Sequence, residues 1–88
     1  MEVYHDVASR RFYVDLEGER AYLEYVIESD ALCVMHTIVP VGISGRGIAG
    51  ALVSAAYDYS CAECLRFVPK CSYAKAWLER YLWTHGGM

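Results

Sequence analysis

The sequence is poor in basic residues. Eight Lys and Arg stand against eleven Asp and Glu, which gives a formal net charge of −3 and an isoelectric point near 5.5. This balance argues against a surface that coats a nucleic-acid backbone, so we expect no nucleic-acid partner. Charged residues also interrupt every hydrophobic segment, and none approaches the roughly 20 apolar residues that span a bilayer. We therefore expect no membrane partner either.

Signal-like, linker-like and repetitive segments are also missing. Met-Glu-Val-Tyr-His-Asp has no basic start followed by an apolar run, so the four cysteines predict reduced thiols in the cytoplasm rather than a disulfide scaffold. A chain of 88 residues holds at most one core, and its 56% apolar residues make that core substantial. Residues 1–88 are expected to form a single domain.

The first half of the chain has the alternation of β-strands. Residues Phe12 to Leu16 alternate between apolar and polar, and the following Glu17-Gly18-Glu19 predicts a hairpin turn to a second strand at Ala21 to Glu28. A third strand, Ala31 to Val39, is almost wholly apolar. We expect it in the sheet centre with both faces covered, ended by Pro40.

The second half predicts helix, strand and helix. Apolar residues recur at helical spacing from Ile48 to about Cys61, Leu65 to Val68 forms a short strand, and Ser72 is a suitable N-cap for a last helix. The tail from Gly86 to Met88 is expected to fray. An antiparallel meander followed by helix, strand and helix is an α+β, or mixed α/β, fold.

A glycine-rich loop joins the third strand to the first helix. Gly45-Arg46-Gly47-Ile48-Ala49-Gly50 matches the dinucleotide pattern G-x-G-x-x-G, but three antiparallel strands precede it and no acidic residue ends the next strand. Its Gly47-Ile48-Ala49-Gly50 also matches the GXXG of RNA-binding KH modules. Arg46 is, however, the only cation between Arg20 and Arg66, which is too few to grip a phosphate backbone.

Two interpretations of this loop stay open. Glycines that permit positive φ and close approach, at a helix N-terminus with free N–H groups, form a binding site for an anion such as pyrophosphate, to which Arg46 adds charge. Alternatively, the same glycines only make a tight turn from strand to helix.

Several motifs together resemble a known family. The segments His36-Thr37-Ile38-Val39-Pro40, Gly45-Arg46-Gly47-Ile48-Ala49 and Val68-Pro69-Lys70-Cys71-Ser72-Tyr73 resemble the very small members of the GNAT-type N-acetyltransferase superfamily. The resemblance spans roughly Phe12 to Tyr81. It implies a GNAT-like fold with splayed central strands, a glycine loop that binds the pyrophosphate of acetyl-CoA or coenzyme A, and a pantetheine arm between the two splayed strands.

The resemblance also implies a set of cofactor-binding residues. They are Ile38, Val39, Ser44, Gly45, Arg46, Gly47, Ile48, Ala49, Cys71, Ser72, Tyr73 and Lys75. The superfamily usually has Arg or Gln three residues before the first signature glycine. If that glycine corresponds to Gly47, the position holds Ser44 here, which departs from the pattern. Thr84-His85-Gly86 departs from the His-Pro that often follows the last helix of the small members.

Cys71 is the first candidate catalytic residue. A thiol just before a helix N-terminus, with Lys70 and Lys75 nearby, is in a setting that stabilises a thiolate. The resemblance suggests either a transient acyl-cysteine or a thiol poised beside the thioester. The alternative is a buried, inert cysteine that fills a gap between diverging strands.

His36 is the second candidate. Simple alternation places it on one face with Leu32, Val34 and Ile38, where a histidine is usually a core residue. Its functional alternative is a general base for an amine, or a partner of Cys71 across the splayed strands. Glu24, Glu28 or water could also accept the proton.

Cys61-Ala62-Glu63-Cys64 is a C-x-x-C motif without a second ligand pair, so we expect no metal site there. It lies at the end of a helix, whereas thioredoxin-like chemistry needs it at the start of one. The sequence therefore predicts an acetyl-CoA-dependent N-acetyltransferase, with an unknown amine acceptor and an undetermined oligomeric state. The alternative is a CoA-binding or protein-interaction module of the same fold that does not catalyse transfer.

Overall fold

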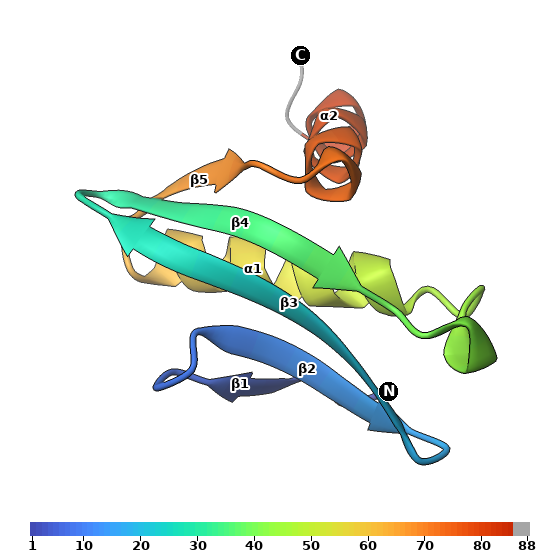
Figure 1. Ribbon diagram of the computed structural model, residues 1–88. Helices are drawn as coiled ribbons and strands as arrows, with labels where there is room; N and C mark the ends of the chain where they lie inside the picture. The colour runs from blue at the N-terminus through green and yellow to red at the C-terminus, as the bar shows by residue number, and fades with distance from the viewer. Residues whose placement is uncertain (86–88) are drawn as a thin grey trace.

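A computed structural model describes residues 1–85, and the predicted tail from Gly86 to Met88 lies outside them. Five strands form one sheet, and two α-helices follow the fourth and fifth strands (Figure 1). In chain order the elements are β1 (Tyr4–Asp6), β2 (Arg11–Leu16), β3 (Glu19–Glu28), β4 (Ala31–Ile38), a 3₁₀ turn (Val41–Ile43), α1 (Ile48–Ala62), β5 (Arg66–Pro69) and α2 (Ser72–His85).

The strands lie side by side in the order in which they occur in the sequence. β1 to β4 pair antiparallel, and only β4 and β5 pair parallel, with α1 as the crossover between them. This confirms the α+β prediction. It also confirms that the glycine loop lies outside a dinucleotide-binding unit, which needs successive parallel strands.

The β2–β3 hairpin has a two-residue turn. Glu17 and Gly18 both adopt positive φ, 53° and 78°, between the paired residues Leu16 and Glu19. Positive φ at both central residues is typical of a type I′ turn, whose twist matches that of the flanking strands. The predicted hairpin is therefore confirmed.

β1 was not expected, because three residues are too few to show an alternating pattern. Its central residue, His5, stacks on Phe12 of β2 with ring centroids 3.9 Å apart. The His5 Nε2 lies 2.7 Å from the Tyr25 hydroxyl. Burial lowers the pKa of His5, although nearby Asp6 partly opposes this. These contacts fix β1 to the sheet.

One face of the sheet forms the core. α1 packs across it, behind β3 and β4 in Figure 1. The core contains alternate residues of β2, β3 and β4 and the inward residues of α1, among them Phe12, Val14, Leu23, Tyr25, Leu32, Val34, Ile48, Leu52 and Val53. Within residues 1–85, neither helix crosses the opposite face of β1–β4, which we call the open face.

β4 changes character halfway along its length. Ala31 to Val34 are buried, but Met35 to Ile38 alternate between half-buried and exposed. The prediction that both faces of this strand are covered is therefore wrong for its second half. Two features explain the change: a β-bulge at Met35, and the end of β5 pairing at Val34 opposite Pro69.

Candidate functional site

The loop between β4 and α1 is built on two glycines in the left-handed region. Gly45 and Gly47 both have φ of 77°, as the sequence predicts, and Gly47 is the N-cap of α1. The Ser44 hydroxyl donates to the carbonyl oxygen of Val41 at 2.9 Å. The chain thus turns sharply from the strand into the helix.

The N-terminus of α1 is open to an anion. The N–H of Ala51 donates to the Gly47 carbonyl at 3.1 Å, so the N–H groups of Ile48, Ala49 and Gly50 precede the first intrahelical bond. No side chain of the described residues caps this end, and the first turn holds no acidic residue. These N–H groups and the helix dipole therefore favour a negative group here.

A cavity of about 310 Å³ lies at this point. Its walls are Val39, Ser44, Gly45, Gly47, Ile48, Ala49 and Tyr73, all of which belong to the cofactor-binding set that the family resemblance implies. Tyr73 comes from the first turn of α2. A Cβ added at Gly50 would lie 3.4 Å from the Tyr73 hydroxyl, so this side chain lies directly against the first turn of α1.

Arg46 does not line the cavity. Its guanidinium pairs with Glu17 of the β2–β3 turn through two hydrogen bonds of 2.5 and 3.0 Å. The hydrogen bonds from Arg46, and then its charge, hold the pKa of Glu17 below its ordinary value. The only cation of the glycine loop is thus held by a carboxylate 29 residues away in sequence.

Cys71, rather than the predicted Ser72, is the N-cap of α2. Its carbonyl accepts the first intrahelical bond, from the N–H of Lys75 at 3.1 Å, and its Sγ accepts the N–H of Ala74 at 3.4 Å. The predicted N-cap is therefore wrong by one residue. The pairing of β5 with β4 ends where the N–H of Lys70 donates to the carbonyl of Val34. That bond places Cys71 at the bend into the helix.

His36 is not where simple alternation places it. The register pairs Tyr25 with Val34 and Glu24 with His36, so Met35 is an extra residue on β4. His36 and Ile38 therefore lie on the open face, opposite to Val34. The His36 side chain is exposed beside Glu24. The predictions that it lies among apolar residues and that it partners Cys71 are therefore both wrong.

Thr37 occupies the place that the sequence analysis gave to His36. The bulge turns it to the core face, where its Oγ1 lies 3.6 Å from the Cys71 Sγ. The sequence shows Thr37 inside the His36-Thr37-Ile38 motif, but only the register identifies which of the three faces the thiol. Glu28, another proposed base, lies at the β3–β4 turn opposite Ala31, remote from this site.

Four further predicted residues stand outside the cavity, and Cys71, described above, is one of them. Ile38 is 47% exposed on the open face, while Ser72 and Lys75 are exposed on the first turn of α2. They surround the site without lining it.

The two central strands diverge beside these residues. β4 and β5 are paired from Ala31 to Val34, after which the chain leaves β5 for α2. The backbone of β4 beyond Val34 has no strand on that side within residues 1–85. The expected splay is therefore present, and we call this gap the opening.

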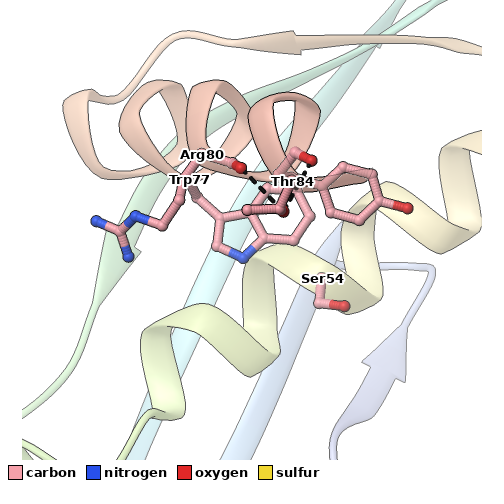
Figure 2. Close-up of a pocket in the computed structure, with 5 residues that line it drawn as sticks. Ser54, Trp77, Arg80 and Thr84 are labelled. Atoms are coloured by element: carbon pink, nitrogen blue, oxygen red, sulfur yellow. Dashed lines mark hydrogen bonds between the residues drawn. The ribbon is translucent and has the colours of Figure 1, made fainter. Parts of the chain in front are cut away.

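A second cavity of about 390 Å³ lies between α1 and α2. Figure 2 shows Ser54 of α1 below Trp77 and Thr84 of α2, with the Arg80 side chain extending away from Ser54, and Tyr81 completes the lining. Trp77 and Tyr81 stack with centroids 5.1 Å apart, and both contact Tyr57 of α1. These aromatic residues pack the two helices together, as their spacing predicts.

Cys61 and Cys64 are both exposed, at the C-terminal end of α1 as expected. No group of three or more metal-binding side chains occurs among the described residues. In the same part of the chain, neither helix is long and apolar enough to cross a membrane.

Comparison with known proteins gives two findings. A family model described as GCN5-related N-acetyl-transferase matches residues 11–84. Protein NATD1 of Bos taurus is 37% identical over 82 residues, which cover 90% of this chain and 73% of that protein. Protein NATD1 of Xenopus tropicalis and of Homo sapiens are each 35% identical over 82 residues, covering 90% of this chain and 75% and 73% of theirs.

Proposed function

Because the chain belongs to the GCN5-related N-acetyltransferase family, we propose that it transfers an acetyl group from acetyl-CoA to an amine. One observation carries the proposal: the cavity at the N-terminus of α1, where the glycine loop, the end of β4 and Tyr73 meet. The family suggests the substrate, and the chemistry of this cavity is suited to it.

The cavity suits a pyrophosphate. Its floor presents the N–H groups of the first turn of α1, which are strong donors to phosphate oxygens. A Cβ added at Gly45 or Gly47 would meet no atom within 4 Å, so the loop backbone borders open space that a phosphate can enter. Arg46 lies between these two glycines and can add a positive charge once it leaves Glu17.

The opening suits the rest of the substrate. β4 beyond Val34 offers backbone N–H and C=O groups that no strand among residues 1–85 uses on that side. An extended chain with amide groups, such as the pantetheine arm, can pair with a free strand edge of this kind. Ile38 and Val39 would contribute their backbone, and Cys71 and Thr37 line the inner side of the opening.

The transfer forms a C–N bond between the amine nitrogen and the thioester carbonyl carbon, breaks the C–S bond and releases coenzyme A as a thiol. An amine attacks only when neutral, so its ammonium proton must pass to a base. His36 and Glu24, opposite each other on the open face beside the opening, are the side chains we propose for this role. Cys71 offers a second route, in which its sulfur accepts the acetyl group before the amine does.

Calorimetry with CoA and acetyl-CoA, followed by mass spectrometry of the protein after incubation with acetyl-CoA, tests the proposal. We expect saturable binding of both ligands and acetyl transfer to an added amine. An acetylated wild type beside an unmodified Cys71→Ala would assign the second route. Saturable binding with no transfer to any amine would instead make the chain a CoA-binding module, and no binding at millimolar ligand would refute the function.

A further inference from the structure

The open face carries a row of three tyrosines and one isoleucine that crosses four strands. Tyr4 pairs with Tyr13, Tyr13 with Tyr22, and Tyr22 with Ile38, so these four residues lie in one line on the same face. The Tyr4 and Tyr13 rings stack with centroids 5.3 Å apart. Tyr4 and Ile38, the two ends, are 43% and 47% exposed. We call this line the aromatic row.

A charged row runs beside it. Asp6 pairs with Arg11, Arg11 with Glu24, and Glu24 with His36. An Arg11 nitrogen lies 3.7 Å from a Glu24 carboxylate oxygen, while the guanidinium covers the Tyr22 ring at 4.5 Å. The two rows thus form one continuous surface in which the aromatic rings are flanked by charges.

This surface has an excess of negative charge. Asp6, Asp15, Glu24 and Glu28 contribute four carboxylates, against the two guanidiniums of Arg11 and Arg20. Both guanidiniums are already engaged. Arg11 pairs with Glu24, and Arg20 binds Asp15 at 2.7 and 2.9 Å and covers the Tyr13 ring. A cationic partner therefore matches the open face.

Both rows end at the opening. Ile38 and His36 are their last members, and they lie on the part of β4 that β5 has left. The bulge at Met35 produces this arrangement, because it turns the side chains of His36 and Ile38 to the open face and that of Thr37 toward the Cys71 thiol. A molecule lying along the aromatic row would thus reach the opening from the side opposite to α1.

We propose that the open face binds the amine acceptor as an extended polypeptide segment that presents a lysine side chain to the opening. This inference rests on the proposed acetyl transfer and names its acceptor class. Four strands spaced about 4.8 Å apart make a row about 14 Å long, the length of roughly four extended residues. Neither of the cavities described above is lined by residues of this row.

The charges also define how the lysine approaches. Glu24 lies on the β3 side of the opening, whereas Lys70 follows β5 on the other side. The ammonium group is therefore drawn toward Glu24 and His36 and away from Lys70. The half-exposed rings of Tyr13 and Tyr22, with the guanidiniums of Arg20 and Arg11 that cover them, hold the flanking residues of the peptide, and a free small amine lacks these contacts.

The test compares two acceptors with the same amine. One is a mixture of end-capped hexapeptides with a central lysine and random flanking residues, and the other is Nα-acetyl-lysine methylamide. With wild type we expect kcat/KM for the peptides to exceed that for the single residue by about tenfold. Tyr22→Leu and Tyr13→Leu should remove most of that advantage, with acetyl-CoA affinity and the single-residue rate within about twofold of wild type.

A matched pair of variants tests the charge. Glu24→Gln should raise KM for the peptides, the parameter that charge attraction governs, in addition to any loss of kcat from its role as a base, whereas Glu28→Gln, the same change four residues along the same face of β3, should alter neither. Equal rates for both acceptors, equal losses in both variants, or better turnover of a free polyamine would overturn the docking inference. So would binding of acetyl-CoA without transfer to peptides. Absence of acetyl-CoA binding would instead refute the proposed function itself.

Discussion

Thr37 and Cys71 face each other across the opening, with Oγ1 of one 3.6 Å from Sγ of the other. The same sulfur accepts the N–H of Ala74 at 3.4 Å, which makes it the side-chain cap of α2. One thiol is therefore held both by β4 and by α2. A change at Cys71 can act on stability and on chemistry, and the two effects have to be separated.

Cys71→Ser and Cys71→Ala separate them. Serine is a good N-cap, so we expect Cys71→Ser to keep the stability of the wild type, while Cys71→Ala lowers the free energy of unfolding by about 0.5–2 kcal/mol. If the sulfur carries the acetyl group, both variants lose transfer. Urea denaturation and an acetyl-transfer assay on all three proteins measure this. Wild-type transfer by Cys71→Ser would leave Cys71 with a structural role only.

Gly47→Ala should weaken acetyl-CoA binding, and Gly18→Ala is its control. The two glycines have φ of 77° and 78°, and a Cβ on either would meet no atom within 4 Å. Both variants should therefore lose a similar stability, about 1–2 kcal/mol, from the left-handed backbone alone. Only the Cβ at position 47 projects into the space proposed for the phosphates. Calorimetric affinities that fall equally in both variants would contradict this.

Glu17→Gln should strengthen acetyl-CoA binding. The glutamate holds Arg46 in a two-bond ion pair at the surface, with both side chains well exposed. Because such pairs contribute little, the released arginine should raise the affinity by only about twofold to fivefold. Arg46→Gln should lower the affinity, and the double variant should match Arg46→Gln. An affinity of Glu17→Gln below that of the wild type would refute competition between Glu17 and the phosphates.

The same pair predicts a pH effect on stability. Arg46 holds the pKa of Glu17 below its ordinary value of 4.5, so the folded protein favours the ionised form. The contribution of the pair is therefore fully present above pH 4.5 and is lost as the pH falls through the lower folded-state pKa. The difference in unfolding free energy between wild type and Glu17→Gln should be constant at neutral pH and should shrink in acid. A difference that grows in acid would contradict this assignment.

His5 predicts a second pH effect, nearer neutrality. Burial lowers its pKa below the ordinary 6.5, so below that pH the unfolded chain binds a proton that the folded protein resists. Stability should therefore fall as the pH drops below 6.5, until the folded-state pKa is passed. Denaturation curves measured between pH 7.5 and pH 5, at intervals of about half a pH unit, give the unfolding free energy as a function of pH. We expect this free energy to fall with pH in the wild type and to fall less steeply in His5→Asn. The same pH dependence of the unfolding free energy in His5→Asn and in the wild type would show that His5 does not cause it.

The glycine loop shows how much of the site local sequence can predict. Gly45, Gly47 and the start of α1 at Ile48 follow from residue types within a few positions of one another. Positive φ and helix initiation are local properties, so the pattern alone predicts them. Six residues in and beside this loop, all in the cofactor set that the family resemblance implies, line one cavity, and Tyr73, from the motif after β5, is the seventh.

The β4 register shows what the sequence could not provide. An extra residue at Met35 reverses the faces of His36, Thr37 and Ile38, and it is visible only in the pairing with β3. The pairing of Arg46 with Glu17 likewise depends on a turn that is distant in the chain. The three-residue β1 has too short a pattern to be recognised before it pairs with β2.

The sequence by itself therefore determined the order of the elements from β2 onward, the β2–β3 hairpin and the turn of the glycine loop into α1. Each of these depends on dihedral preferences or periodicity over a few neighbouring residues. Only the tertiary structure decided that Thr37 meets Cys71 and that His36 joins Glu24 on the open face. Side-chain direction in a strand reverses with one inserted residue, and the insertion is set by the partner strand.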